Sequence, residues 1–559
     1  MPGYFRAVAL DLDGTLAVGD VVPSDVLRAL DELRSAGVAA LLVTGRIQEE
    51  LEASFPGLAA RFDAVVMENG AIVQVGPLRR LMGPPVDREL QHVLERRGVR
   101  LRRGRCLLAC DGRSAHLALE EITRLGLDCQ LVHNRAALMV LPSGVTKAVG
   151  LNEALRQLAI SAHNCLAVGD AENDLALLHA AEVGVAADGA VASLRTQADA
   201  VLPGFLGADL AALLRGSLLR GVTQYCPPRR WVVVGDDDAG APVHVPGSQA
   251  EVLVTGASGS GKSYLAGLLF ERWTEAGYVV LLLDPEGDHA RLGELPGVVV
   301  VDASRHGGPL GDALAVLLQH TSVVLDLSGL DERARSAHLS QARRAVETQR
   351  ALHGVPHWIV VEEAHLLLGE DDPQQGALLT RGLCLVTYRP DLLPPERKAG
   401  VDVTLTTVLP AGPADLTGTR RSVRAVLHEG TAQTPFAAAG RRSVHVRHRR
   451  KYTDVELPPQ RWFQFRTAEG ATGVAAHNIS DFVRQLRSCP PSAIDHHALR
   501  GDFSRWVVGV LQDNALAAQL AATEREVSDR HEATLQAARQ RMVDAVERRY
   551  GVGVAPDCT

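Results

Sequence analysis

Two aspartates, two residues apart, follow a short apolar stretch near the start of the chain. Asp11 and Asp13 stand in Asp-Leu-Asp-Gly-Thr, directly after Val8–Leu10. Side chains at positions i and i+2 of a strand end point the same way, toward the carboxyl edge of a sheet. One carboxylate can attack a phosphorus centre, and the other can protonate the leaving alcohol and then activate water. The alternative interpretation is a turn rich in Asp and Gly.

Three further polar signals follow in the order that this chemistry needs. Thr44 and Gly45 come after the next apolar stretch and offer a hydroxyl and a backbone N–H to a phosphate. Lys147 lies beyond an insert, and Asp170 and Asp174 follow a third apolar stretch. Because clustered carboxylates repel one another without a cation, the pattern predicts Mg²⁺.

A second set of phosphate-binding residues lies in the middle of the chain. The segment Gly-Ala-Ser-Gly-Ser-Gly-Lys-Ser matches G-x-x-x-x-G-K-[ST], between a strand predicted at 251–255 and a helix predicted at 262–275. We expect Lys262 to reach the β- and γ-phosphates of ATP and Ser263 to bind Mg²⁺. The predicted ATP-binding residues are Gly256, Ser258, Gly259, Ser260, Gly261, Lys262 and Ser263.

An acidic pair fits the Walker B position of such a site. The apolar run Trp358–Val361 ends in Glu362 and Glu363. We expect Glu362 to hold the metal and Glu363 to orient and deprotonate the attacking water. The alternative is a helix start rich in Glu.

The elements that must position these residues alternate between strands and helices. At 559 residues the chain is long enough for about two to four domains. From Ala7 to about Leu214, apolar strands alternate with amphipathic helices such as the one predicted over Ser24–Ala36, which indicates a parallel sheet. A second α/β block runs from about Trp231 to about His448. A third segment ends in a helical stretch predicted over 515–550.

Composition favours a folded protein of the reducing cytosol. The chain is 46% hydrophobic and 22% charged, and its net charge of −8 provides no global attraction to nucleic acid. Its eight cysteines lack metal-ligand spacing, and Cys106 and Cys110 are interpreted as buried thiols on one strand face. We see no secretory signal and no apolar stretch of the roughly 18 residues that cross a bilayer, so we expect a cytoplasmic protein without a membrane partner.

The first block resembles the haloacid dehalogenase (HAD) superfamily, subfamily IIB, the Cof-like and sugar-phosphate phosphatases. The likeness covers about residues 4–215 and all four motifs, together with Glu-Asn-Gly-Ala at 68–71. It implies that Asp11 is the nucleophile and Asp13 the general acid and base, and that Thr44 and Lys147 hold the phosphoryl group. It also implies a small α/β cap, which selects the substrate. The metal ligands implied are Asp11, the Asp13 carbonyl and Asp170, with Asp174 in support.

The second block resembles the HerA/VirB4-like ATPases of the FtsK–HerA group over about residues 230–430. Two positions depart from the usual pattern: Glu362 replaces the Walker B aspartate, and Thr-Tyr-Arg-Pro at 387–390 replaces a polar sensor. The sequence therefore predicts ATP binding more firmly than fast hydrolysis. A DNA motor would also need a ring of subunits and an arginine acting in trans, for which Arg381 and Arg389 are the candidates.

Together these signals predict a multidomain α/β protein. The expected order is a HAD Rossmann-like domain at 1–218 with a cap at about 72–143, a linker at 219–230, a P-loop domain at 231–450 and a mostly helical domain at 451–559. The predicted function is a phosphomonoesterase fused to an ATP-binding regulator, and its expected partners are a phosphorylated small molecule and ATP. The alternatives are a HerA-like nucleic-acid motor, working as a homo-oligomer, and a slow ATP-dependent switch. The basic run at 441–451 could bind nucleic acid or be a solvated connector.

Overall fold

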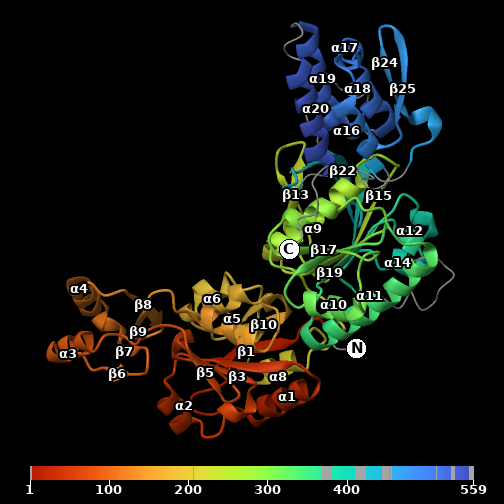
Figure 1. The fold of residues 1–559 in the computed structure, drawn as a ribbon. Coiled ribbons are helices and arrows are strands. Elements are labelled where there is room, and N and C mark those ends of the chain that lie inside the picture. Colours follow the sequence, from red (N-terminus) through yellow and green to blue (C-terminus); the bar gives the residue numbers. More distant parts are fainter. Residues whose placement is uncertain are drawn as a thin grey trace. The chain divides into compact units, whose positions relative to one another are not determined.

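The computed structural model (Figure 1) describes residues 3–204, 207–367, 381–409, 423–443, 452–453, 456–511, 513–529 and 535–552. The chain divides into two compact units. The first comprises Met1–Trp231 with the short segments Pro246–Gln249 and Glu347–Val355. The second comprises Val232–Val245, Ala250–Val346 and Pro356–Thr559.

An eight-stranded sheet forms the centre of the first unit, in the order β12-β11-β10-β1-β2-β3-β4-β5. Strand β1 (Ala7–Asp11) runs parallel to β10 (Cys165–Gly169) and β2 (Ala39–Val43) on its two sides. The carboxyl ends of these three strands therefore meet at one edge of the sheet. The other strands are β3 (Ala64–Met67), β4 (Ile72–Val75), β5 (Leu78–Leu81), β11 (Val183–Ala186) and β12 (Ala200–Val201).

Helices cover both faces of this sheet because its central strand is apolar on both sides. Val8 and Leu10 of β1 belong to one buried cluster, and Ala7 and Ala9 belong to another. The first cluster includes residues of α1 (Ser24–Ser35) and α8 (Ala208–Leu214). The second includes residues of α5 (Lys147–Gln157) and α6 (Leu175–Ala180). Shorter helices are α2 (Gln48–Ser54) and α7 (Ala192–Arg195).

A separate small sheet forms the cap, with strand order β6-β7-β9-β8. The hairpin expected around residues 133–135 joins its last two strands in sequence. Strands β4 and β5 lie inside the range expected for the cap, but they extend the core sheet, because β4 pairs antiparallel with β3. The cap elements are α3 (Arg88–Arg96), β6 (Arg102–Arg103), β7 (Leu108–Asp111), α4 (Ala115–Leu125), β8 (Cys129–Asn134) and β9 (Ala137–Pro142).

The segment expected to be a linker is bound to the first unit. Leu219 is buried in the cluster beneath α1 and α8. The guanidinium groups of Arg229 and Arg230 each donate to the carbonyl oxygen of Ala181, just beyond α6, at 2.9 and 2.5 Å. The compact body therefore continues to Trp231.

The second unit contains an eleven-stranded sheet in the order β14-β13-β23-β22-β21-β15-β20-β19-β16-β18-β17. Strand β15 (Glu251–Gly256) is followed by the phosphate-loop sequence and then by α9 (Lys262–Glu275). β20 (Leu383–Val386) lies between β15 and β19 (Trp358–Val361), parallel to both. The other strands are β13 (Val232–Asp237), β14 (Pro242–Val245), β16 (Val280–Asp284), β17 (Val298–Asp302), β18 (Ser322–Asp326), β21 (Val403–Val408), β22 (Arg424–Glu429) and β23 (Ala432–Ala438).

The other helices of this block follow the strands along the chain. They are α10 (Leu310–Leu317), α11 (Glu332–His353), α12 (Ala364–Leu367) and α14 (Pro395–Ala399). No helix in the described part of the chain is both long and apolar enough to cross a membrane.

The C-terminal segment has its own buried cluster, which combines a hairpin with helices. The helical stretch expected over 515–550 contains two helices, α19 (Asn514–Asp529) and α20 (Leu535–Tyr550). Both helices contribute side chains to the cluster, so the apolar face of each is buried against the same core. The other elements are β24 (Phe463–Thr467), β25 (Gly470–Ala476), α16 (Ile479–Ser488), α17 (Pro491–Ala498) and α18 (Asp502–Trp506).

Candidate active sites

Three of the predicted acidic residues come together at the carboxyl edge of the first sheet. Asp11 ends β1, and Asp170 and Asp174 belong to the turn after β10. All three are buried, and one oxygen from each lies within 4.8 Å of the others. The parallel register of β1 with β10, which pairs Leu10 with Val168, accounts for this meeting of residues far apart in sequence.

Lys147 joins this cluster from the first turn of α5. The hydroxyl of Thr146 caps the helix by accepting from the N–H of Val149 at 3.3 Å. The Lys147 ammonium donates to Asp11 Oδ1 and Asp174 Oδ1, both at 2.5 Å. Burial works against the charge on Lys147, but these two carboxylates outweigh it and raise its pKa. Burial, together with the charge of Asp174, raises the pKa of Asp11, and Lys147 opposes that rise.

The acidic cluster fits Mg²⁺. Asp170 Oδ1 is buried and has no hydrogen-bond partner among the described residues, which is the state of an oxygen that a cation would satisfy. Asp174 Oδ2 accepts from the backbone N–H groups of Asp170 and Ala171, both at 3.0 Å, so its carboxylate is held in place. Hard carboxylate oxygens are the ligands that Mg²⁺ prefers. The side chain of Asp13 is not among the three clustered carboxylates, and the role of its carbonyl as a ligand stays a prediction.

The Asp13 carboxylate is paired with Arg46. Arg46 Nη2 donates to Asp13 Oδ1 at 2.6 Å, and Nε donates to Oδ2 at 2.9 Å. The Arg46 guanidinium also lies 5.1 Å from the centre of the Phe55 ring. Sequence reasoning assigned only backbone and hydroxyl roles to the Thr-Gly-Arg motif and missed this guanidinium. An arginine two residues after the threonine predicted to bind phosphate was the available signal.

Thr44 and Gly45 follow β2, whose last residue, Val43, pairs with Asp11. Thr44 is fully buried, and its hydroxyl accepts from the N–H of Arg46 at 3.1 Å. A Cβ atom on Gly45 would lie 3.3 Å from Met139 Sδ, on cap strand β9. Gly45 therefore allows the cap and the core to approach each other closely.

The junction between core and cap is built around Glu68. Its buried carboxylate accepts from the backbone N–H groups of residues 105, 106 and 107, at 2.7, 2.8 and 3.2 Å. Glu68 and Asn69 have positive φ angles of 51° and 57°, and Gly70 has a φ of 102°. A Cβ atom on Gly70 would lie 1.9 Å from the carbonyl oxygen of Thr146, so only glycine fits beside the residue that precedes Lys147.

An arginine of the cap reaches the acidic cluster. Arg135 lies between β8 and β9 and has a φ angle of 51°. Its Nη2 contacts Asp170 Oδ2 and donates to the carbonyl oxygen of Gly189 at 3.0 Å. Its backbone N–H donates to Glu172 at 3.1 Å. The sequence offered only one signal for this contact, an arginine in a predicted hairpin turn.

The phosphate-loop residues form a second site, in the second unit. Gly256, Gly259 and Gly261 have φ angles of 139°, 81° and 104°, which favour glycine. The Ser260 hydroxyl lies 2.6 Å from the Thr407 hydroxyl on β21. Lys262 donates to the carbonyl oxygen of Ala257 at 3.1 Å. The loop also contains Ser258, and Ser263 lies in the first turn of α9.

The predicted Walker B residues follow β19. Glu362 is buried, and its Oε1 lies 2.7 Å from His289 Nε2. Burial, with help from the charge of Glu286, raises the pKa of Glu362 to about 8, while burial lowers the pKa of His289 to about 4. Glu363 has a φ angle of 46°, and its Oε2 lies 3.4 Å from His365 Nδ1. The sequence placed His365 in the Glu-Glu-Ala-His motif without a role, and His289 was missed.

A buried threonine lies at the end of the strand between β15 and β19. The Thr387 hydroxyl is 3.0 Å from His365 Nδ1 and accepts from the N–H of Arg389 at 2.9 Å. A polar group is therefore present after β20, although the sequence there departs from the expected sensor. Asp284, at the end of β16, accepts from the N–H groups of Gly287 and His289, both at 2.8 Å, and so positions the loop that carries His289.

The two candidate arginines of a nucleic-acid motor form ion pairs within the chain, and most of the basic run lies outside the described residues. Arg381 pairs with Asp402 at 3.4 Å, and Arg389 pairs with Asp391 at 2.9 Å. Arg441, at the start of the basic run, is buried and bonds to Glu271 of α9 at 3.0 Å. The rest of the run, from residue 444 to 451, is outside the described residues.

Comparison with known proteins gives matches to both blocks. A family model described as haloacid dehalogenase-like hydrolase matches residues 8–78 and 120–204, and one described as helicase HerA, central domain, matches residues 241–353. Phosphoglycolate phosphatase 2 of Saccharolobus solfataricus is 30% identical over 203 residues, covering 35% of this chain and 84% of that protein. The phosphoglycolate phosphatase of Methanopyrus kandleri is 30% identical over 228 residues, covering 37% and 95%. A solved haloacid dehalogenase-like hydrolase from B. subtilis aligns at 20% identity with a TM-score of 0.32, covering 38% of this chain and 99% of that one.

Proposed function

Because this chain belongs to the haloacid dehalogenase-like hydrolase family, we propose that its first unit hydrolyses phosphate monoesters with Mg²⁺, through an aspartyl-phosphate on Asp11. The observation that carries the proposal is the buried cluster of Asp11, Lys147, Asp170 and Asp174, in which one oxygen of Asp170 has no partner in the part of the chain that the structure describes. One edge of the sheet thus carries the proposed nucleophile, the ammonium group of Lys147 and carboxylate oxygens suited to a metal ion.

The proposed reaction has two displacements. An Asp11 oxygen forms a bond to phosphorus as the bond from phosphorus to the alcohol oxygen breaks, and Asp13 gives that oxygen a proton. Asp13 then takes a proton from water, which attacks phosphorus and releases Asp11. Lys147 and Thr44 hold the phosphoryl oxygens. Mg²⁺, held by Asp11, Asp170, Asp174 and the Asp13 carbonyl, would offset the charge of the phosphoryl group.

The proposed mechanism requires Arg46 to loosen its hold on Asp13. The bidentate pair occupies both carboxylate oxygens of Asp13, which the leaving alcohol and the attacking water must reach. We propose that substrate entry weakens this pair, so that Arg46 also serves as a positioning residue for the acid.

We propose that the substrate is a small phosphorylated carboxylic acid. Two relatives are named phosphoglycolate phosphatases, and Arg135 brings a guanidinium from the cap to within contact of Asp170. A guanidinium is suited to bind a carboxylate in a bidentate manner. Arg135→Ala should therefore raise KM for phosphoglycolate more than KM for p-nitrophenyl phosphate, which has no carboxylate.

The test of the phosphatase is a phosphate-release screen of the full chain over phosphoglycolate, sugar phosphates and nucleotides, with Mg²⁺ or with EDTA. We expect Asp11→Asn to abolish release from every substrate while the fold is retained. Asp20→Asn is the matched control, because this aspartate lies near the site, 3.6 Å from Arg46, but is 80% exposed and has no proposed role in the reaction. An Asp11→Asn variant with normal turnover would refute the aspartyl-phosphate.

For the second unit we propose ATP binding by the loop at 256–263, hydrolysis with Glu363 as the base, and regulation of the phosphatase by nucleotide state. The observations in support are the positive φ angles of the three loop glycines and the close approach of Gly256 to β21, where a Cβ would lie 2.3 Å from the Thr407 hydroxyl. The match to the HerA central domain favours a second candidate, a nucleic-acid motor. A motor predicts an ATP-dependent increase in oligomer size and a salt-sensitive DNA gel shift, and a regulator predicts neither.

A further inference from the structure

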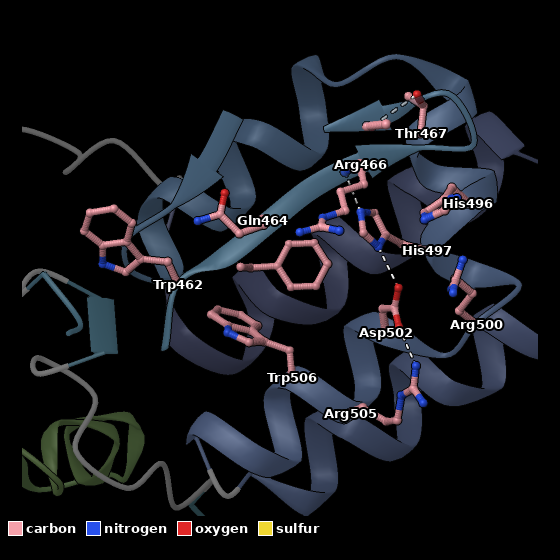
Figure 2. A pocket seen from close by; sticks show the side chains of 12 residues that line it. Trp462, Gln464, Arg466, Thr467, His496, His497, Arg500, Asp502, Arg505 and Trp506 are labelled. Atoms are coloured by element: carbon pink, nitrogen blue, oxygen red, sulfur yellow. Dashed lines mark hydrogen bonds and ion pairs between the residues drawn. The ribbon is translucent and has the colours of Figure 1, made fainter. Parts of the chain in front are cut away.

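The C-terminal part of the second unit carries a pocket that neither predicted phosphate site uses. It lies between the hairpin β24–β25 and helices α17 and α18 and has a volume of about 540 Å³ (Figure 2). Its lining includes Arg466, Arg500 and Arg505, together with Trp462 and Trp506. Neither family model reaches this part of the chain.

The lining has an excess of positive charge. Asp502 is its only acidic residue, and it already accepts from His497 Nδ1 at 2.8 Å and pairs with Arg505. Three arginines against one carboxylate leave two positive charges when the histidines are neutral. Neither the Arg466 nor the Arg500 side chain forms an ion pair within the described part of the chain. Two exposed guanidinium groups at an open pocket favour an anionic ligand.

A metal ion is a poor fit to the same residues. His496, His497 and Asp502 have suitable atoms within 4.8 Å of one another. However, His497 uses both ring nitrogens: Nδ1 donates to Asp502, and Nε2 accepts from the N–H of Arg466 at 2.8 Å. Its imidazole is therefore neutral and has no lone pair left for a metal. The surrounding arginines would also repel a cation.

The two tryptophans provide fixed apolar surfaces beside this charge. The Trp462 indole N–H donates to the carbonyl oxygen of Leu457 at 2.6 Å, and that of Trp506 donates to Arg461 at 2.9 Å. Both side chains are half-buried and line the pocket, so their polar atoms are satisfied while part of each ring remains exposed. Aromatic rings beside arginines form the stacking surfaces on which proteins bind nucleobases.

We propose that this pocket binds a nucleotide unit, with its base stacked on Trp462 or Trp506 and its phosphate between Arg466 and Arg500. The unit can be a free nucleotide or one residue of a single strand, since both present the same base and phosphate. An acidic peptide would use the arginines but leave the tryptophans without a role. The proposal does not depend on the phosphatase or on the P-loop.

The test measures fluorescence anisotropy of a labelled twelve-residue oligo(dT) without terminal phosphates, bound to the full chain in EDTA. EDTA withholds the Mg²⁺ that both phosphate sites are proposed to need. Arg466→Ala/Arg500→Ala should weaken binding and reduce the slope of log K against log salt by about 1.4. Trp462→Leu should weaken binding roughly fivefold or more and leave that slope unchanged. Arg484→Ala is the matched control, because Arg484 is an exposed arginine of the same segment outside the pocket.

Competition identifies the source of the ligand. Displacement of the oligonucleotide by dTMP at equal nucleotide concentration indicates a free nucleotide, whereas displacement by unlabelled oligo(dT) alone indicates a single strand. The proposal is overturned if the wild-type chain binds neither dTMP nor the oligonucleotide. It is also overturned if Arg484→Ala weakens binding of the oligonucleotide as much as the double variant does, or if a polyglutamate peptide competes as well as unlabelled oligo(dT). Unchanged binding by the double variant would instead assign the oligonucleotide to another surface, such as the basic run at 441–451.

Discussion

Two buried lysines begin helices at the two phosphate sites, and their surroundings differ. Lys147 opens α5 and bonds to two carboxylates, those of Asp11 and Asp174. Lys262 opens α9 and donates to the neutral carbonyl oxygen of Ala257. The first site is therefore assembled by charges that belong to the protein itself. At the second site the charge of Lys262 opposes the rise in the pKa of Glu362, and the loop adds backbone groups that the phosphates of a ligand could meet.

The acidic residues of the two sites also differ in what surrounds their carboxyl groups. In the first site a backbone turn and Lys147 hold Asp174 in place. In the second, burial raises the pKa of Glu362 to about 8, and its carboxyl bonds to His289. We infer that folding and chemistry are tightly coupled in the first site and separable in the second, and the predictions below test this difference.

The largest expected effect is that of Lys147→Met. This change leaves Asp11 and Asp174 buried without their cation, so we expect loss of phosphate release and about 3–5 kcal/mol less stability. Lys262→Met should weaken ATP binding with a much smaller loss. Calorimetry of the two full-length variants measures the unfolding transition of each. Equal losses of stability would remove the contrast between the two sites.

Asp13→Asn should lower turnover by about 10²–10⁴-fold, the usual contribution of general acid–base catalysis. Its melting temperature should stay near that of the parent, because the carboxylate is 39% exposed and lies outside the buried cluster. Steady-state phosphate release measures the effect. A variant with reduced stability and normal turnover would reassign Asp13 to a structural role.

Glu363→Gln should retain ATP binding and lose hydrolysis, by roughly 10²-fold or more, since only the proposed base is removed. Glu362→Gln is the informative companion, because it resembles the protonated carboxyl that the raised pKa favours. The companion should keep the fold and lower the affinity for Mg²⁺–ATP. Normal hydrolysis by Glu363→Gln would place the base elsewhere.

The smallest expected effect is communication between the units. We predict that residues 1–231 alone fold and release phosphate, and that ATP changes the rate or affinity only in the full chain. Typical coupling of about 1–3 kcal/mol corresponds to roughly 5–150-fold. This boundary is preferable to 1–218, because Leu219 packs in the core of the first unit and Arg229 and Arg230 form hydrogen bonds to it. A folded but inactive truncation would mean that the first unit needs residues beyond 231.

Local patterns were sufficient to predict the elements that carry the motifs. The strand predicted before Glu362 and the helix predicted after the phosphate loop have the bounds expected from their apolar runs. The helical stretch predicted at 515–550 is confirmed over α19 and α20, because charged, alanine-rich sequence favours helix. Residues 530–534 lie outside the described residues.

Long-range contacts could not be predicted in the same way. Arg46, Arg135 and His289 reach their partners only through strand order and loop conformation. The cap range began too early because β4 and β5 extend the core sheet, and alternating hydrophobicity does not tell which sheet a strand joins. The C-terminal pocket was missed for the same reason, since its arginines and tryptophans come from separate elements.

The core–cap junction at Glu68 has a consequence for protein engineering. Its carboxylate recognises backbone N–H groups at 105–107, which any non-proline residue supplies. Gly70 and Gly104 are sterically fixed beside it, since a Cβ on Gly104 would lie 2.5 Å from the Glu68 carboxyl carbon. The cap can therefore be exchanged as a cassette that begins after β5, keeps a glycine at the position of Gly104, and ends before Thr146. A library of grafted caps would vary substrate choice while leaving the attachment unchanged.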